Sequence, residues 1–170
     1  MADTQFELES DSPALPDMMF WQLGGVESFS RPSRYMLTVL SRNRQIKPDD
    51  VLGKSFTIKL EFHDEGGGAH KRQYQGHAMR MRRVGDANER LCLYHIELDS
   101  WFSLLQHRTN ARIFQEKKLD EVIKEVMQDS NIRTVENIDY AGLREAHDPH
   151  RYCVQYLESD FAFLSRLMEH

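Results

Sequence analysis

The sequence has little of what marks the most easily recognised protein classes. It contains only two cysteines, Cys92 and Cys153, too few for a disulfide framework. Both lie in strand-like apolar runs, where a lone cysteine is usually a small buried hydrophobe. A formal net charge of −5 is too weakly acidic to suggest a particular partner and lacks the clustered positive charge of a nucleic-acid-binding protein. We interpret the one basic cluster, Met79–Arg83, as the exposed face of an edge strand.

Long hydrophobic runs are also missing. No apolar stretch approaches the roughly 20 residues that cross a bilayer. The first twelve residues, MADTQFELESDS, are acidic and lack the basic and apolar regions of a Sec signal peptide. We therefore expect the protein to be made in the cytoplasm and, if it leaves the cell, to use a route that needs no such signal.

Catalytic motifs are missing as well. The sequence has no G-x-S-x-G elbow and no H-E-x-x-H pair. The glycines at 66–68 lack the lysine and the following helix of a phosphate loop. Cys92 and His95 are three residues apart on an expected strand, so their side chains point to opposite faces. Glu61 and Glu65 are more simply explained as solvated charge than as a carboxylate pair. We therefore predict no catalytic residue and no cofactor, and we expect a protein that is not an enzyme.

The eight histidines raise the question of a metal site. A hairpin could bring His63 and His77 together, but no third ligand has a fixed position, and zinc sites usually show tight paired spacings. His147 and His150 form a weaker pair, because Pro149 prevents the helix that would align them. We interpret all four as exposed loop histidines and predict no metal site.

The sequence does contain the alternating apolar and polar pattern of β-strands. Of its 170 residues 40% are hydrophobic and 29% charged, as in an ordinary globular protein of one domain or two very small ones. In residues 55–62 apolar and polar side chains alternate, as in a strand with one wet face. Residues 73–81 and 90–98 are further strands after short turns, and Gly76 suggests a bulge or a close backbone approach. This pattern predicts an antiparallel meander that curls into a barrel.

Helical spacing follows the strands. Leu119, Val122, Ile123, Val126 and Met127 recur at the intervals of an amphipathic helix. The fold class is therefore α+β and mostly antiparallel β, a barrel-like sheet with two or three helices. We expect four segments: a polar tail or strap at 1–16, a first β-barrel domain at 17–99, a helical connection at 100–130, and the start of a second, incomplete domain at 131–170.

The closing stretch, Glu158–His170, predicts a helix capped by Ser159. Its large apolar residues are our candidates for a packing or subunit-interface role: Phe161, Phe163, Leu164, Leu167 and Met168. In one interpretation they cover the first barrel and complete a small closed core. In the other they stay partly exposed for a missing strand or for another subunit.

Four segments, in order, carry a resemblance. These are DDVLGKSFTIKLEF at 49–62, YQGHAMRM at 74–81, YHIELDSWFSLLQHRTNARIFQEKKLDEVIKEVM at 94–127, and YCVQYLESDFAFLSRLMEH at 152–170. They resemble the N-terminal part of valine-glycine repeat protein G (VgrG), the spike of the type VI secretion system. The last segment is the most specific, since it is similar to the family's QY-x-E-S-D-F-x-F-L-x-R-L-M-E run almost residue by residue.

The resemblance implies a structural role. The family's N-terminal region is similar to the hub of contractile phage tails, in which three copies form a collar of paired β-barrels between tube and needle. The implied partners are other copies of the chain, the tube protein, baseplate components and effectors. The implied location is the cytoplasm before firing, followed by delivery through the type VI system.

The sequence departs from the family in length, because the segments that follow the last run in family members are missing. We expect either a fragment of a longer protein or a short natural relative, and a monomeric or weakly associated chain. Two other functions stay open: the hub of a phage or phage-like contractile tail, and a small enzyme or metal protein with an unrecognised site.

Overall fold

The chain folds into two compact units, Met1–Ser100 and Trp101–His170. The computed structural model describes residues 5–28, 31–63, 68–130 and 148–169. Each unit has its own cluster of buried side chains. Among the described residues, no helix combines the length and apolarity needed to cross a bilayer.

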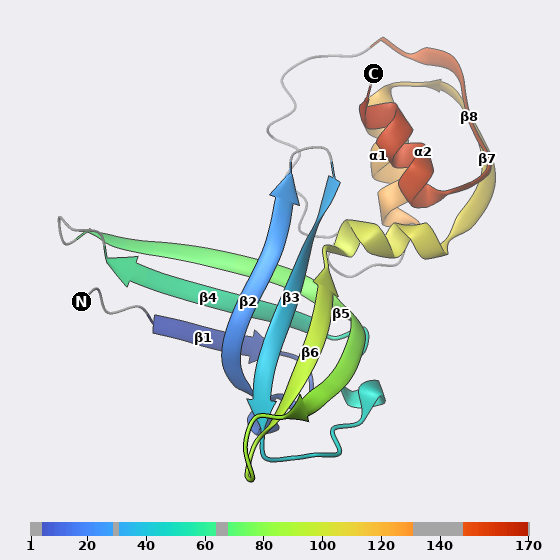
Figure 1. Cartoon of the computed structure of the whole chain (residues 1–170). Helices are drawn as coiled ribbons and strands as arrows, with labels where there is room; N and C mark the ends of the chain where they lie inside the picture. The colour runs from blue at the N-terminus through green and yellow to red at the C-terminus, as the bar shows by residue number, and fades with distance from the viewer. Residues whose placement is uncertain (1–4, 29–30, 64–67, 131–147, 170) are drawn as a thin grey trace. The chain divides into compact units, whose positions relative to one another are not determined.

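The first unit is one strongly curled antiparallel sheet. Its strands are β1 (Gln5–Ser10), β2 (Met19–Ser28), β3 (Arg31–Ser41), β4 (Ser55–His63), β5 (Ala69–Asp86) and β6 (Cys92–Asp99), with short 3-10 turns η1 (Leu15–Asp17) and η2 (Pro48–Asp50). They follow the order β1-β4-β5-β6-β3-β2, a half-barrel whose two edges are β1 and β2 (Figure 1). The expected meander of β4, β5 and β6 is confirmed.

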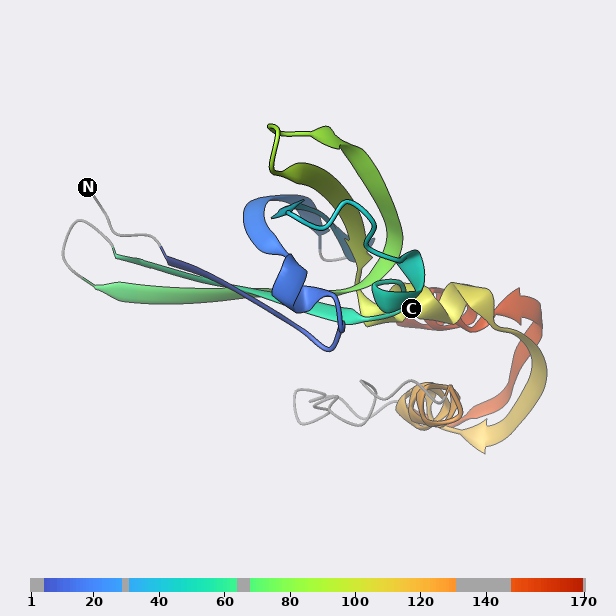
Figure 2. The ribbon, with the colours of Figure 1, turned by 90° about the horizontal axis from the view of Figure 1, so that it is seen from below.

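Alternation along the strands decides which face of this sheet is buried. In β6 buried and partly exposed residues alternate over the whole strand, from the fully buried Cys92 onward. In β4 Phe56 and Ile58 are buried, while Phe62, near the strand end, is 37% exposed. Figure 2 shows why: the β4–β5 hairpin, with β1 alongside it, extends as an arm from the curled part of the sheet.

Within residues 1–16, which were expected to form a polar tail or strap, Gln5–Ser10 is strand β1, paired with β4 in unbroken antiparallel register. Phe6 and Leu8 face the groove and core side, while Glu7 and Glu9 flank Lys59 on the neighbouring strand. The segment is acidic enough to look like a tail. Its cross-strand partner, some 50 residues away, makes it a strand.

The interpretation of Met79–Arg83 as an edge strand agrees with the pairing of these residues. They belong to the second half of β5, which among the described residues pairs with β6 on one side only, because the pairing of β5 with β4 ends at His77. Their charged side chains lie on a wet face. Arg80 forms an ion pair with Glu97 on β6 at 3.4 Å, and Arg82 lies 3.2 Å from the Nδ1 atom of His95 on the same strand. Alternation revealed the wet face, but the position of the strand in the sheet depends on pairings that are distant in the chain.

Two glycines permit close backbone approaches. A Cβ on Gly76 would lie 2.9 Å from the Leu98 Cβ, which confirms the close approach expected there. A Cβ on Gly25 would lie 2.4 Å from the Tyr35 ring. We expected Gly24 and Gly25 to close an apolar run, but both lie inside β2, where Gly25 leaves room for that ring.

The second unit is a two-stranded ribbon covered on one side by helices (Figure 1). Its elements are the 3-10 helix η3 (Trp101–His107), β7 (Thr109–Lys117), α1 (Leu119–Gln128), β8 (His150–Ser159) and α2 (Asp160–Met168). Strand β7 was not expected, since residues 100–130 were predicted to be a helical connection. Its pairing partner β8 lies more than 30 residues further along the chain, which local spacing does not reveal.

Both α-helices begin as their sequences allow. Ser159 caps α2 as predicted, because its Oγ accepts the Ala162 N–H at 3.1 Å. Helix α1 has no such cap, and its first turn instead uses Glu121, whose carboxylate accepts the Lys118 N–H at 2.9 Å. The second unit's core is made of residues from η3, β7, α1 and α2: Leu105, Phe114, Val122, Val126, Met127, Phe163, Leu164 and Leu167.

We predict that Leu164→Asp unfolds the second unit, while Met168→Asp does not. Leu164 is fully buried and Met168, on the same helix, is 53% exposed. Burying a carboxylate where Leu164 packs costs about 3 kcal/mol or more of unfolding free energy. Thermal unfolding followed by circular dichroism measures both, and equal melting of the two variants contradicts the packing described here.

Candidate functional site

The candidate residues of the closing helix are not a single exposed surface. Phe163, Leu164 and Leu167 are buried in the second unit's core. Phe161 is partly buried, and its ring lies 5.0 Å from that of Phe102. Met168 is exposed. A subunit-interface role for these residues stays a prediction.

A larger apolar surface lies on the ribbon of β7 and β8. We call it the ribbon face, and it consists of Ala111, Ile113, Gln115, Tyr152, Val154 and Tyr156. Its large side chains are strongly exposed, Ile113 at 66%, Tyr152 at 59% and Tyr156 at 73%. The sequence pattern indicated that Tyr152, Val154 and Tyr156 share a face, and this is confirmed. That the shared face is the uncovered one was not expected.

Register creates the ribbon face. Ile113 pairs with Val154, and Ala111 with Tyr156, so apolar side chains meet across the strands. The intervening residues Phe114 and Gln155 point to the other side and are buried. The ribbon face carries no formal charge, and uncharged surfaces rich in tyrosine are typical of the centre of protein–protein contacts.

Next to the ribbon face the backbone is strained. Leu157 has a φ of 49°, in the left-handed region that favours glycine, and its side chain is 67% exposed. It is the extra residue of a bulge, because Tyr156 pairs with Ala111 and Glu158 with Asn110. A bulge re-aims the side chains beside it, so this one presents an apolar side chain to solvent at an energetic cost.

A buried carboxylate holds the bulge in place. Asp160, at the start of α2, is fully buried and accepts amide N–H groups from Gln155 at 2.8 Å and Asn110 at 3.0 Å. The Gln155 amide also donates to the Glu158 carbonyl at 3.1 Å. Arg108, just before β7, and Arg112, on β7, lie 3.5 and 3.7 Å from the second Asp160 oxygen. The Asp160 carboxylate thus links the end of β8, the bulge and the start of α2, which all lie within the run QYLESD.

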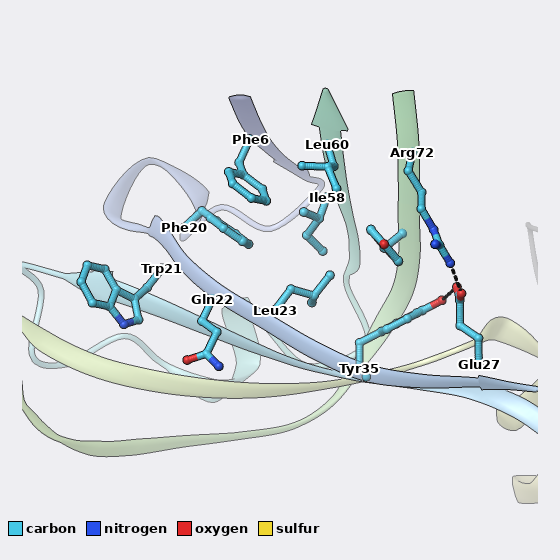
Figure 3. Close-up of a pocket in the computed structure, with 12 residues that line it drawn as sticks. Phe6, Phe20, Trp21, Gln22, Leu23, Glu27, Tyr35, Ile58, Leu60 and Arg72 are labelled. Carbon is cyan, nitrogen blue, oxygen red and sulfur yellow. Dashed lines mark hydrogen bonds and ion pairs between the residues drawn. The ribbon is translucent and has the colours of Figure 1, made fainter. Parts of the chain in front are cut away.

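The first unit has a groove of about 560 Å³ on the inner side of its half-barrel (Figure 3). Phe6 on β1 and Phe20 on β2 stack at its mouth, with ring centroids 4.7 Å apart. Ile58, Leu60 and Leu23 are among the apolar residues lining it. Sequence reasoning did not find this groove, because its two walls belong to strands at opposite edges of the sheet.

At one end of the groove, polar and charged side chains pair with one another. Tyr35 donates its hydroxyl to Glu27 at 2.5 Å, and Arg72 forms an ion pair with the same carboxylate (Figure 3). The tyrosine hydrogen bond, followed by the arginine charge, lowers the pKa of Glu27. Burial and the neighbouring carboxylate raise the pKa of Tyr35. Arg72 also lies over the Tyr74 ring, 4.9 Å from its centroid.

Comparison with known proteins bears on both units. Residues 26–170 match the family model described as phage tail baseplate hub (GPD). The chain belongs to this family.

Within this hub family the chain is similar to curated spike proteins of the type VI secretion system. It is 33% identical over 160 residues to VgrG1b and 32% identical over 160 residues to VgrG1c, both of Pseudomonas aeruginosa. Each alignment covers 94% of this chain, but only 20% and 21% of the relatives. The chain therefore spans about a fifth of the length of the curated relatives it matches.

A solved structure supports the hub fold. The E. coli c3393 protein, described as a component of the type VI secretion system similar to the T4 tail proteins gp27 and gp5, matches with a TM-score of 0.71. The match covers 95% of this chain and 42% of that one, at 20% identity. The mostly antiparallel β fold inferred from the sequence and its resemblance to the phage tail hub are confirmed.

The histidines that raised the metal question lie apart in this hub chain. His63 pairs with Ala69, whereas His77 pairs with Ser55 at the other end of the β4–β5 hairpin. At about 3.3 Å per residue the two backbones are separated by roughly 26 Å. The hairpin therefore does not bring the two histidines together. The interpretation of His63, His77 and His150 as exposed loop histidines is wrong, since His63 lies in β4, His150 lies in β8, and His77 is partly buried in β5. His147 and Glu65 lie outside the described residues, and Glu61 pairs with Lys71 at 3.2 Å. Among the described residues no group of three metal-ligating side chains gathers.

The two cysteines of the hub chain are free thiols, Cys92 buried and Cys153 partly buried. They lie in different units. Burial raises the pKa of the Cys153 thiol. Cys92 and His95 point to opposite faces of β6, as predicted.

His77 predicts a pH-dependent stability. Burial lowers its pKa below the usual 6.5, with Asp11 opposing the shift, so the folded state takes up the proton less readily than the unfolded chain. Stability therefore falls as pH is lowered from about 6.5 through the folded-state pKa. His77→Gln flattens this slope in urea unfolding, whereas Gln73→Ala on the same strand leaves it unchanged. Equal slopes in all three proteins contradict the assignment.

We predict that replacing Leu157 with glycine stabilises the folded protein. Leu157→Gly removes the cost of the left-handed backbone and raises the free energy of unfolding by about 0.5–1 kcal/mol. Tyr156→Gly, one residue earlier in extended backbone, lowers it by about as much. Urea unfolding compares the two variants, and a loss of stability in both shows that the bulge is unstrained.

Proposed function

We propose that this chain is a structural part of the hub of a type VI secretion spike, where it joins other components by contact and catalyses no reaction. Its membership of the phage tail baseplate hub family supports the structural role, and identities of 32–33% to curated spike proteins support the type VI assignment. The observation that carries the proposal is the match over residues 26–170, which reaches into both units and includes the ribbon face.

The ribbon face supplies a physical reason for assembly. Ile113, Tyr152 and Tyr156 expose large apolar surfaces side by side on a rigid ribbon. A monomer seldom leaves such a surface to water, since covering each large side chain gains roughly 1.5–3 kcal/mol. We infer that a neighbouring component of the spike covers it.

The partners of the hub role are further copies of the chain in a trimer, the tube protein, baseplate components and effectors. The location is the cytoplasm before firing, and afterwards the medium or the target cell reached through the type VI apparatus. These assignments rest on the family and on the names of the relatives.

The second candidate is the hub of a phage or phage-like contractile tail. The family model is described as a phage tail baseplate hub, which favours this role. The similarity to curated spike proteins of type VI secretion systems favours the first. Genes for sheath and tube proteins next to an ATPase identify a secretion system, whereas capsid and tail-fibre genes identify a phage.

A chimera tests the secretion role. The matching 160 residues of VgrG1b are replaced by this chain in a Pseudomonas aeruginosa strain without its other spike proteins. We expect the chimera to be secreted at a level comparable with VgrG1b. Tyr156→Asp in the chimera places a charge on the ribbon face and reduces secretion at least tenfold, because burying it against a partner costs more than about 1.4 kcal/mol.

Arg90→Ser serves as the matched control, since Arg90 is exposed in the β5–β6 turn, outside the ribbon face. Circular dichroism of the purified 170-residue chain confirms that each variant folds. A folded chimera that is not secreted contradicts the secretion role. Normal secretion of the Tyr156→Asp chimera contradicts the role of the ribbon face.

A further inference from the structure

The half-barrel of the first unit ends in two edges, β1 and β2. Within the described residues, β1 pairs only with β4, and β2 only with β3. Each edge therefore presents a row of backbone N–H and C=O groups without a partner strand, which is a template for one more strand.

Of the two edges, β1 is the better template. All six of its residues pair with β4 without a shift in register, from Gln5 opposite Glu61 to Ser10 opposite Phe56. Strand β2 breaks register at Trp21 and again at Glu27. Bulges of this kind disrupt pairing along an edge, whereas a regular edge accepts it.

The bulge on β2 has a second effect, because it leaves Trp21 61% exposed on the wall of the groove. Trp21 lies on the side of Phe6 away from Leu60, which is the side of the free β1 edge (Figure 3). Phe6 itself is 51% exposed although it stacks on Phe20. A strand added to β1 would lay its inward side chains against these rings.

The outer face of β1 has the opposite chemistry. Glu7 and Glu9 point away from the groove, with side chains 65% and 46% exposed, and share the single cation Lys59. The three side chains leave one negative charge beside the free edge. An added strand would place its outward side chains directly across from Glu7 and Glu9, where opposite charges are favoured.

We propose that the free edge of β1 binds an extended segment of a partner protein in which apolar residues alternate with lysine or arginine. The apolar residues enter the groove against Phe6, Phe20 and Trp21. The basic residues face Glu7 and Glu9. The charged groups at the far end of the groove already satisfy each other, so inward positions need no charge.

Synthetic peptides test the proposal on the whole chain. The probe is a fluorescein-labelled seven-residue peptide alternating valine and lysine, and its partner carries glutamate in place of lysine. In fluorescence anisotropy we expect the lysine peptide to bind about tenfold more tightly at 0.05 M salt, with the ratio falling towards one at 1 M salt. Equal affinity for the two peptides, or binding of neither, overturns the proposal.

Backbone pairing is tested separately from composition. N-methylation of alternate residues along one edge of the lysine peptide removes the N–H groups that pair with β1, and should reduce binding at least tenfold. The same modification on the other edge should leave binding within twofold. Equal effects of both patterns show that the peptide does not bind as a strand.

Three variants locate the site. Trp21→Ser removes the exposed ring and should weaken binding at least fivefold, and Glu7→Gln should weaken it about threefold and reduce its salt dependence. Glu89→Gln, exposed in the β5–β6 turn, is the matched control and should change nothing. Unchanged binding by both Trp21→Ser and Glu7→Gln excludes this site.

A second copy of the chain is the other possible source of a strand. If a second copy occupies the edge, the chain self-associates as its concentration rises, and this protects the β1 amides from hydrogen exchange. Self-association of this kind that the lysine peptide does not displace overturns the proposal of a partner segment. The inference does not depend on the proposed function, since the peptide tests use the isolated chain and the secretion test concerns the ribbon face.

Discussion

A β-strand has two faces, and both units of this protein depend on how many of those faces their cores can cover. In the first unit the sheet curls upon itself, so that inward residues such as Leu37, Phe56 and Ile96 cover one another. In the second unit helices cover one side of the ribbon and leave the other in water. The ribbon face follows from this limit, because no described part of the chain covers it. The free β1 edge is a second unpaired surface of the same kind, since within the described residues β1 pairs only with β4.

Uncovered β surface is consistent with a protein of the phage tail baseplate hub family. The centre of a protein–protein contact is formed by apolar area that water no longer reaches. The buried Asp160 carboxylate makes the ribbon rigid by joining β7, β8 and the start of α2. The strained backbone at Leu157 persists because that network surrounds it.

Local pattern predicted much of this architecture. The alternating run at 55–62, the amphipathic spacing from Leu119 to Met127 and the Ser159 cap each depend on neighbours within a few residues, and all three are confirmed. The errors share one cause. Strands β1 and β7 were missed, because each is defined by pairing with residues distant in the chain.

The candidate residues show the same division. Sequence spacing was sufficient to place Tyr152, Val154 and Tyr156 on one face, since side chains alternate in any strand. Only the tertiary structure decided that this face is open, because the helices pack against Phe114 and Gln155 on the other side. Likewise the sequence by itself determined the alternation of residues 5–10, but the fold decided that they form a free edge beside Trp21. Periodicity is a property of the local backbone, whereas exposure depends on which distant elements pack against it.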